Sequence, residues 1–292
     1  MRLNARLTHW SSAAFVPLWS SGILFGAMAL RHGPPFAITA LRFVCATLLL
    51  AMLALLRGTP WPRGTILFHA AMVGLLMQGL HYGAIYAGLH AGMPAGVAAL
   101  VVGLIPVATA IGAVPLLGEA FTRRRLAAAV LGGAAALLVV WTKMKIDSGP
   151  AVVFGGLALA GGAGAALWQK RFGVGGASLS AAAVQLAVGT VVMGLCWLVL
   201  ERGQGTSIEF GLPFLVPFTW TVIANSVGAT LLLLWLLDRG AAGQVTGLFF
   251  LVPPVTALTA LPLLGEQPSL PLLLAIALGV GAVRLLATEK PR

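Results

Sequence analysis

The 292-residue chain has few charged residues, and only seven of its side chains are acidic. Charged residues make up 9% of the sequence, whereas hydrophobic residues make up 59%. A chain of this length and composition cannot bury most of its apolar surface in a water-soluble domain. Long apolar runs separated by short polar segments predict instead a protein that folds within a lipid bilayer.

Acidic residues are absent from the interior of the apolar runs. The seven carboxylates lie in loops or at the ends of runs: Glu119, Asp147, Glu201, Glu209, Asp238, Glu266 and Glu289. Transporters that exchange cationic drugs for protons, and sodium-coupled transporters, need an acidic side chain at membrane depth. Both classes are therefore disfavoured, and transport without ion coupling stays open.

Cysteine is also scarce, because Cys45 and Cys196 are the only two and both fall within apolar runs. We expect no disulfide and interpret both thiols as packing residues. Histidine, cysteine and acidic residues do not cluster at the spacing of a metal site. We therefore expect no metal, no cofactor and no enzyme active site.

Apolar runs long enough to cross about 30 Å of hydrocarbon as a helix occur ten times. None alternates with polar residues as the strands of a membrane barrel do. The predicted fold is an all-α membrane protein of ten transmembrane helices. The expected spans are 10–30, 34–56, 65–90, 95–117, 124–142, 150–170, 178–200, 213–237, 242–264 and 269–288.

The chain contains an internal duplication. Leu104–Glu119 (LIPVATAIGAVPLLGE) recurs without a gap as Leu251–Glu266 (LVPPVTALTALPLLGE), an offset of 147 residues. Each predicted half, 1–145 and 146–292, contains five spans. Because five is odd, the two halves must have inverted orientations, which is the arrangement that alternating-access transporters use around a central cavity.

The net charge of +11 follows the loops rather than a binding motif. Basic residues concentrate in the loops on the side of the N-terminus, so the positive-inside rule predicts that both termini are cytoplasmic. No basic cluster interleaved with aromatic residues is present, so we expect no nucleic-acid partner. The expected partners are the lipid bilayer and a small-molecule substrate, and the expected state is a monomer or a weak homodimer.

The third span has the most polar face of the chain. Helical spacing places six of its residues on one side: Gln78, His81, Tyr82, Ile85, Tyr86 and Leu89. Polar side chains at membrane depth face either a watery cavity or other helices. Two interpretations therefore stay open, a substrate-binding face and a hydrogen-bonded cluster that holds helices together. His81 is likewise a candidate proton carrier or a satisfied structural histidine.

Other spans contribute four further candidates for substrate binding: Trp19, Trp168, Asn225 and Phe249. The two tryptophans could stack on a substrate or act as packing wedges. Arg42 and Gln185 lie within spans and are interpreted as structural. Pro106, Pro253 and Pro254 interrupt the fourth and ninth spans and are predicted hinges, and Gly118 and Gly265 are predicted helix caps, each followed by an architectural glutamate.

The chain resembles the drug/metabolite transporter superfamily, and within it the EamA-type ten-helix exporters. The resemblance rests on Trp19-Ser20-Ser21, Arg42, Trp168 and the repeated Pro-Leu-Leu-Gly-Glu at 115–119 and 262–266. It implies a central cavity lined by spans one, three, four, six, eight and nine, with spans five and ten at the periphery.

Some exporters of this family, to which the chain is similar, carry aromatic amino acids. The predicted function is therefore export of small metabolites across a bacterial inner membrane, with aromatic or other large neutral amino acids as the expected substrates. The entry region of the fourth span reads Val101-Val102-Gly103 and lacks an aromatic pair found in dedicated aromatic exporters. Proton-coupled drug efflux is the alternative, and a membrane-embedded lipid-modifying enzyme is a further one. A polyanion exchanger would need more basic residues in its cavity.

Overall fold

The structure is a computed structural model that describes residues 2–120, 122–143, 149–172, 178–205, 207–238, 252–265 and 269–287. All regular structure in these residues is helical, as the apolar runs predict. Seven described helices are long and apolar enough to cross a bilayer: 14–32, 35–56, 64–90, 95–117, 152–172, 179–204 and 212–232.

The remaining three predicted spans are also helical where they are described. Those at 124–142 and 269–288 contain only shorter qualifying apolar stretches, Leu126–Ala135 and Leu270–Ala282. The ninth predicted span is described from Val252 onward, and Phe249 and Glu266 lie outside the described residues. The all-helical membrane fold is confirmed, whereas the number ten stays a prediction.

The helices follow one another along the chain with short connections. In the first half they are α1 (Arg2–Ala29), η1 (Leu30–His32), α2 (Pro35–Leu56), α3 (Gly64–Gly74), η2 (Leu75–Tyr82), α4 (Gly83–His90), α5 (Ala95–Leu117) and α6 (Arg123–Lys143). In the second half they are α7 (Gly149–Phe172), α8 (Leu179–Cys196), η3 (Trp197–Glu201), η4 (Arg202–Gln204), α9 (Leu212–Trp220), η5 (Thr221–Ala229), α10 (Thr230–Asp238), α12 (Val252–Leu264) and α13 (Leu270–Ala287).

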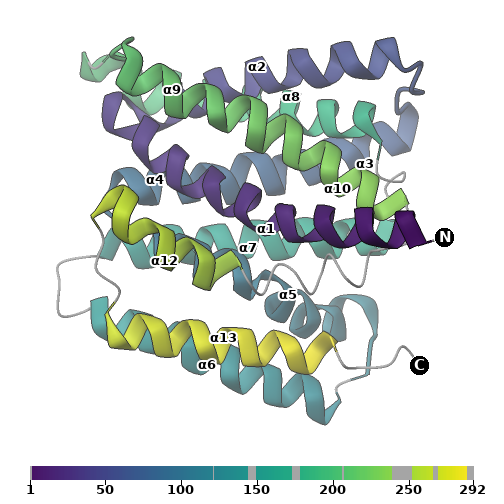
Figure 1. Cartoon of the computed structure of the whole chain (residues 1–292), viewed down its shortest axis with the longest axis vertical. Helices are drawn as coiled ribbons and strands as arrows, with labels where there is room; N and C mark the ends of the chain where they lie inside the picture. The colour runs from purple at the N-terminus through teal and green to yellow at the C-terminus, as the bar shows by residue number, and fades with distance from the viewer. Residues whose placement is uncertain are drawn as a thin grey trace.

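Helices from the two sequence halves pack against each other (Figure 1). α2 lies on α8, α5 on α7, α1 on α12 and α6 on α13, so each of these pairs takes one helix from each half. α6 and α13 form one edge of the bundle, the peripheral position that the family resemblance implies for spans five and ten. The start of α1 and the end of α13 lie at the same end of the bundle.

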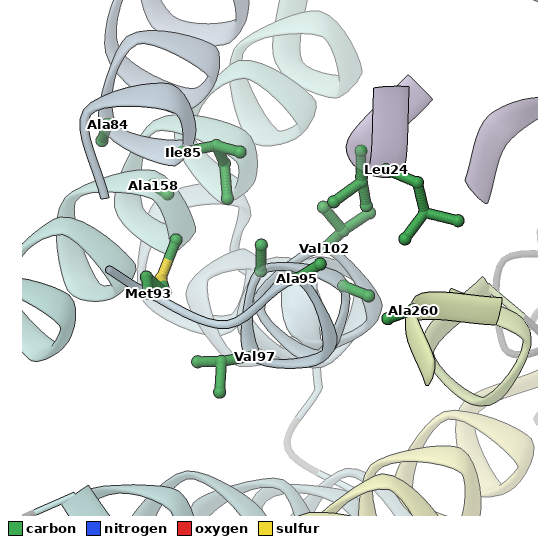
Figure 2. Close-up of a cluster of buried hydrophobic side chains, with 12 residues drawn as sticks. Leu24, Ala84, Ile85, Met93, Ala95, Val97, Val102, Ala158 and Ala260 are labelled. Atoms are coloured by element: carbon green, nitrogen blue, oxygen red, sulfur yellow. The ribbon is translucent and has the colours of Figure 1, made fainter. Parts of the chain in front are cut away.

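Small side chains allow the helices to approach closely. Figure 2 shows a buried cluster where α1, α4, α5, α7 and α12 meet. It contains Ile23, Leu24, Ala84, Ile85, Met93, Ala95, Val97, Ala98, Ala99, Val102, Ala158 and Ala260. In a bilayer, helix association depends on close packing rather than on removing apolar surface from water, so alanine is as useful here as larger residues.

The bundle places apolar residues outside and several polar residues inside. Val199 and Leu137 are 79% and 70% exposed, whereas Arg42 is 5% and His81 is 2% exposed. A soluble protein would show the opposite distribution. This distribution fits a bundle whose outer surface contacts lipid and whose interior holds the polar groups.

Two local features recur at the offset of the sequence duplication. The π-helical segment η2 covers 75–82, and the π-helical segment η5 covers 221–229, which is the same region 147 residues later to within one residue. Gly118 and Gly265 follow the last residues of α5 and α12, and both have φ of +70°. That left-handed conformation confirms the prediction that both glycines are helix caps.

Candidate functional site: a buried arginine cluster

Arg42 lies in the body of α2 and is surrounded by neutral polar side chains. Its Nε donates a hydrogen bond to Oγ of Ser226 at 2.9 Å, and its Nη2 donates to Oδ1 of Asn225 at 2.6 Å. Its Nη1 donates to the hydroxyl of Tyr86. The guanidinium carbon also lies 5.9 Å from the ring centre of Tyr82 and 5.3 Å from that of Tyr86, within range of a cation–π interaction. We call these five residues the arginine cluster.

The two π-helical segments position most of the cluster. Asn225 and Ser226 are consecutive residues of η5, and Tyr82 is the last residue of η2. Inside α-helices, π-helical turns are rare and occur often at functional sites. Because a π turn is wider than an α turn, neighbouring residues point in more similar directions, which lets Asn225 and Ser226 both reach the guanidinium.

α1 closes the cluster on another side through its backbone. Nδ2 of Asn225 donates to the carbonyl oxygens of Leu18 and Trp19, at 3.4 and 3.5 Å. Gly22 and Gly26 present no side chain at this contact. A Cβ built on Gly26 would fall 2.5 Å from Cε1 of Tyr86, so any side chain at position 26 would clash with the tyrosine ring.

The carboxylates whose side chains the structure describes have other roles. Glu119 pairs with Lys170 where α5 and α7 end, as predicted for an architectural glutamate. Glu201 accepts hydrogen bonds from the backbone N–H groups of Phe36 and Ala37, both at 2.9 Å. Glu209 lies 3.6 Å from the Nδ1 atom of His32. None of these three carboxylates is bonded to Arg42, so its described partners are neutral.

The structure brings together three of the predicted substrate-binding residues: Tyr82, Tyr86 and Asn225. Trp19 contributes its carbonyl oxygen to Asn225, while its ring lies 5.3 Å from that of Phe15. The guanidinium of Arg42, which the sequence analysis interprets as structural, is the centre of the group. Its helix, α2, is also outside the set of spans expected to line a cavity.

The other two polar residues of the predicted third-span face, Gln78 and His81, contact different helices. Gln78 packs against α8, where a Cβ built on Gly189 would lie 2.5 Å from the Cβ of Gln78. His81 approaches α7, and its Nδ1 lies 2.7 Å from the carbonyl oxygen of Ala158. Since a carbonyl oxygen can only accept, Nδ1 is the donor. This satisfied bond favours the structural interpretation of His81 over the proton carrier.

Trp168 lies in a separate aromatic group formed by α3 and α7. Its ring centre is 5.9 Å from that of His69 and 4.6 Å from that of Phe172, and the rings of His69 and Phe172 stack at 4.4 Å. Its indole nitrogen and Nδ1 of His69 are both buried without a hydrogen-bond partner. The described contacts of Trp168 therefore support the packing interpretation.

The predicted hinge prolines lie where α5 meets α12. Pro253 and Pro254 fall in the first turn of α12 as described, and Pro106 lies within α5. A Cβ built on Gly103, one turn before Pro106, would lie 2.6 Å from Cγ of Pro253. Pro253 thus forms part of a close contact between α5 and α12, and the hinge role of the three prolines stays a prediction.

Sequence reasoning underestimated two residues of the cluster, Arg42 and Ser226. A usable signal for Arg42 was its position, because an ionisable residue inside a membrane span is a functional candidate by default. Ser226 had no signal beyond its adjacency to Asn225. Among the residues that the structure describes, no three histidine, cysteine or acidic side chains gather as a metal site would require.

The chain is similar to known proteins in both sequence and fold. Residues 11–141 match the model of the EamA-like transporter family, which belongs to the drug/metabolite transporter superfamily. One solved structure, described only as "Crystal structure of protein", aligns with a TM-score of 0.63 over 96% of this chain and 95% of the other, at 20% sequence identity. At that identity the likeness shows the fold alone. No curated protein matches the sequence.

Proposed function

We propose that this chain, whose residues 11–141 match the model of the EamA-like transporter family, exports amino acids with aromatic or other large neutral side chains. The family match and the apolar helices support a multi-pass membrane transporter of small molecules. The substrate class, the direction of transport and the mechanism are the proposal. The proposal also includes location in a bacterial inner membrane, with both termini in the cytoplasm.

The observation that carries the proposal is the arginine cluster within a lipid-facing bundle. Helices from both sequence halves supply it, since Arg42 and Tyr86 come from the first and Asn225 and Ser226 from the second. Movement of one half against the other would therefore change the cluster directly. A substrate site at the interface of two repeats is the usual arrangement in secondary transporters.

The chemistry of the cluster suits a zwitterionic molecule with an apolar side chain. Tyrosine rings offer an apolar face, Asn225 offers both a donor and an acceptor, and Arg42 offers a positive charge. An amino acid with a large neutral side chain can use all three. The described span interiors offer no carboxylate for a coupling proton or sodium ion, so we propose facilitated diffusion along the substrate gradient.

The duplication supports alternating access by two inverted repeats. The repeated Pro-Leu-Leu-Gly-Glu segments end α5 and α12 with the same glycine conformation, and π-helical segments recur at the same offset. Rocking of the repeats about the contact between Gly103 and Pro253 would open the cluster to either side in turn.

The test is uptake of radiolabelled phenylalanine and leucine into proteoliposomes, with and without a pH gradient. We expect uptake that equilibrates without a gradient and that is lost in Tyr82→Ala. Phe210→Ala is the matched control, because this aromatic residue is 68% exposed and lies before α9. Uptake no greater than in empty vesicles would refute the amino-acid assignment and make proton-coupled drug efflux the class to test next. Uptake only with a pH gradient would refute facilitated diffusion and show proton coupling.

A further inference from the structure

Arg42 is a buried cation whose described partners are all neutral. A guanidinium carries five N–H donors, and here the described acceptors are a serine hydroxyl, a tyrosine hydroxyl and an amide oxygen. These acceptors satisfy donors but do not balance the charge. A cation that is removed from water and lacks a counter-charge is expensive to keep, and such residues inside membrane spans mark substrate or ion pathways.

We propose that Arg42 binds the carboxylate of the transported molecule. This inference rests on the proposed transport function and names the group that the site recognises. A carboxylate would supply the missing counter-charge, and its two oxygens match the planar fork of a guanidinium. The three described carboxylates cannot do so where they stand, because each is engaged at a helix end.

The neutral partners of Arg42 are suited to change roles when the carboxylate arrives. The hydroxyls of Tyr86 and Ser226 accept from Arg42 in this structure, and hydroxyls can also donate. With the guanidinium turned toward a carboxylate, both hydroxyls could donate to the same oxygens. Nδ2 of Asn225 is a further donor, held at long distances of 3.4 and 3.5 Å from the α1 carbonyls.

The duplicated half repeats this geometry without the charge. At the offset of 147 residues, Asn225 corresponds to Gln78 and Arg42 corresponds to Gly189. Gln78 packs directly against Gly189, just as Asn225 contacts Arg42. The equivalent pair thus keeps the amide, as Gln78, but has glycine in place of the cation. Among the described residues, Arg42 is the one buried lysine or arginine, and a single positive charge fits a monocarboxylate and not a polyanion.

The experiment compares four ligands that share a phenyl ring: phenylalanine, phenylalaninamide, 3-phenylpropionate and phenethylamine. The last two cross bilayers when uncharged, so the readout is binding to purified protein, measured as the ligand-induced rise in melting temperature. The variants are Arg42→Gln, Arg42→Lys and the control Thr39→Val. Thr39 is buried one turn from Arg42 and bonds only to its own helix, at the Pro35 carbonyl.

We expect wild type and Thr39→Val to bind phenylalanine and 3-phenylpropionate, and to bind the amide and the amine about 10- to 100-fold more weakly. In Arg42→Gln this preference disappears, and Arg42→Lys keeps part of it because its charge remains without the fork. The ligand comparison in wild type needs no variant, so misfolding of Arg42→Gln does not leave the inference untested.

Three results would overturn the inference. The first is equal binding of phenethylamine and phenylalanine by wild type, the second is an unchanged carboxylate preference in Arg42→Gln, and the third is no binding of either carboxylate to wild type. Failure of the transport proposal is separate, because it shows as absent phenylalanine uptake in proteoliposomes. In that case loss of 3-phenylpropionate binding in Arg42→Gln would still support a carboxylate site, whereas no binding of either carboxylate to wild type would overturn it.

Discussion

Gly22 of α1 touches the side chain of Asn225, so that a Cβ built on Gly22 would fall 2.5 Å from Oδ1 and still closer to Cγ and Nδ2. Any side chain at position 22 must displace the amide that holds Nη2 of Arg42. We expect Gly22→Ala to lower phenylalanine uptake about tenfold, as loss of a hydrogen bond to a charged group implies. Proteoliposome uptake at equal protein content measures this.

The matched control is Gly194→Ala in α8, where a built Cβ meets open space. Its uptake should equal that of wild type. Equal uptake by Gly22→Ala and wild type would show that the contact between α1 and Asn225 is not needed for transport.

The two tyrosines of the arginine cluster should differ in their need for a hydroxyl. Tyr86 accepts a hydrogen bond from Arg42 through its hydroxyl, whereas Tyr82 presents its ring face to the guanidinium. We expect Tyr86→Phe to reduce phenylalanine affinity severalfold and Tyr82→Phe to retain it, because only the first substitution removes a partner of the charge. Titration of the melting temperature with phenylalanine measures both, and the reverse order would contradict the geometry.

Glu201 caps a helix from the other half of the chain. Its carboxylate accepts from the first backbone N–H groups of α2, where Pro34 and Pro35 offer no capping side chain of their own. We expect Glu201→Gln to lower the free energy of unfolding by about 1–2 kcal/mol, because an amide has one acceptor oxygen and no charge to complement the helix dipole. Thermal unfolding in detergent measures this change.

Glu209→Gln is the control for that substitution. The Glu209 side chain is 79% exposed and faces His32, so its replacement should change stability by less than about 0.5 kcal/mol. If the two variants unfold at the same temperature, the cap contributes nothing.

Replacing glycine by alanine should have opposite effects at the two helix caps and in the middle of a helix. Gly118 and Gly265 have φ of +70°, a conformation that strains residues with a Cβ, so Gly→Ala at either should destabilise by about 1 kcal/mol. Gly133 lies within α6 with open space around it, so Gly133→Ala should stabilise by about 0.5–1 kcal/mol. Thermal unfolding of the three variants gives the signs, and a stabilised Gly118→Ala would contradict the cap.

Local patterns in the sequence predicted the helices and their ends well. The expected span 65–90 corresponds to helices that run from Gly64 to His90, and the expected span 95–117 corresponds to α5. Both are determined by runs of apolar residues and by the proline or glycine that limits them. The sequence also predicted an architectural role for Glu119, but not its partner Lys170, which lies near the end of α7.

The polar face of the third span was less predictable. Helical spacing placed Gln78, His81, Tyr82 and Tyr86 together, but the structure directs them to α8, α7 and α2. The reason is the π-helical segment η2, which changes the angle between successive side chains and so divides the expected face. Propensity gives no warning of such a segment, because its hydrogen bonds are set by the packing of neighbouring helices.

The sequence by itself determined that this chain is a helical membrane protein with an internal duplication. The length of the apolar runs, the lack of acidic residues within them and the repeated segment are all properties of the linear sequence and need no contact between distant residues. Only the tertiary structure decided which polar residues meet. Arg42 and Asn225 are 183 residues apart, and they touch because α1, α2 and the π-helical segment η5 converge there. Interactions between distant helices depend on the register and rotation of each one, which no local pattern encodes.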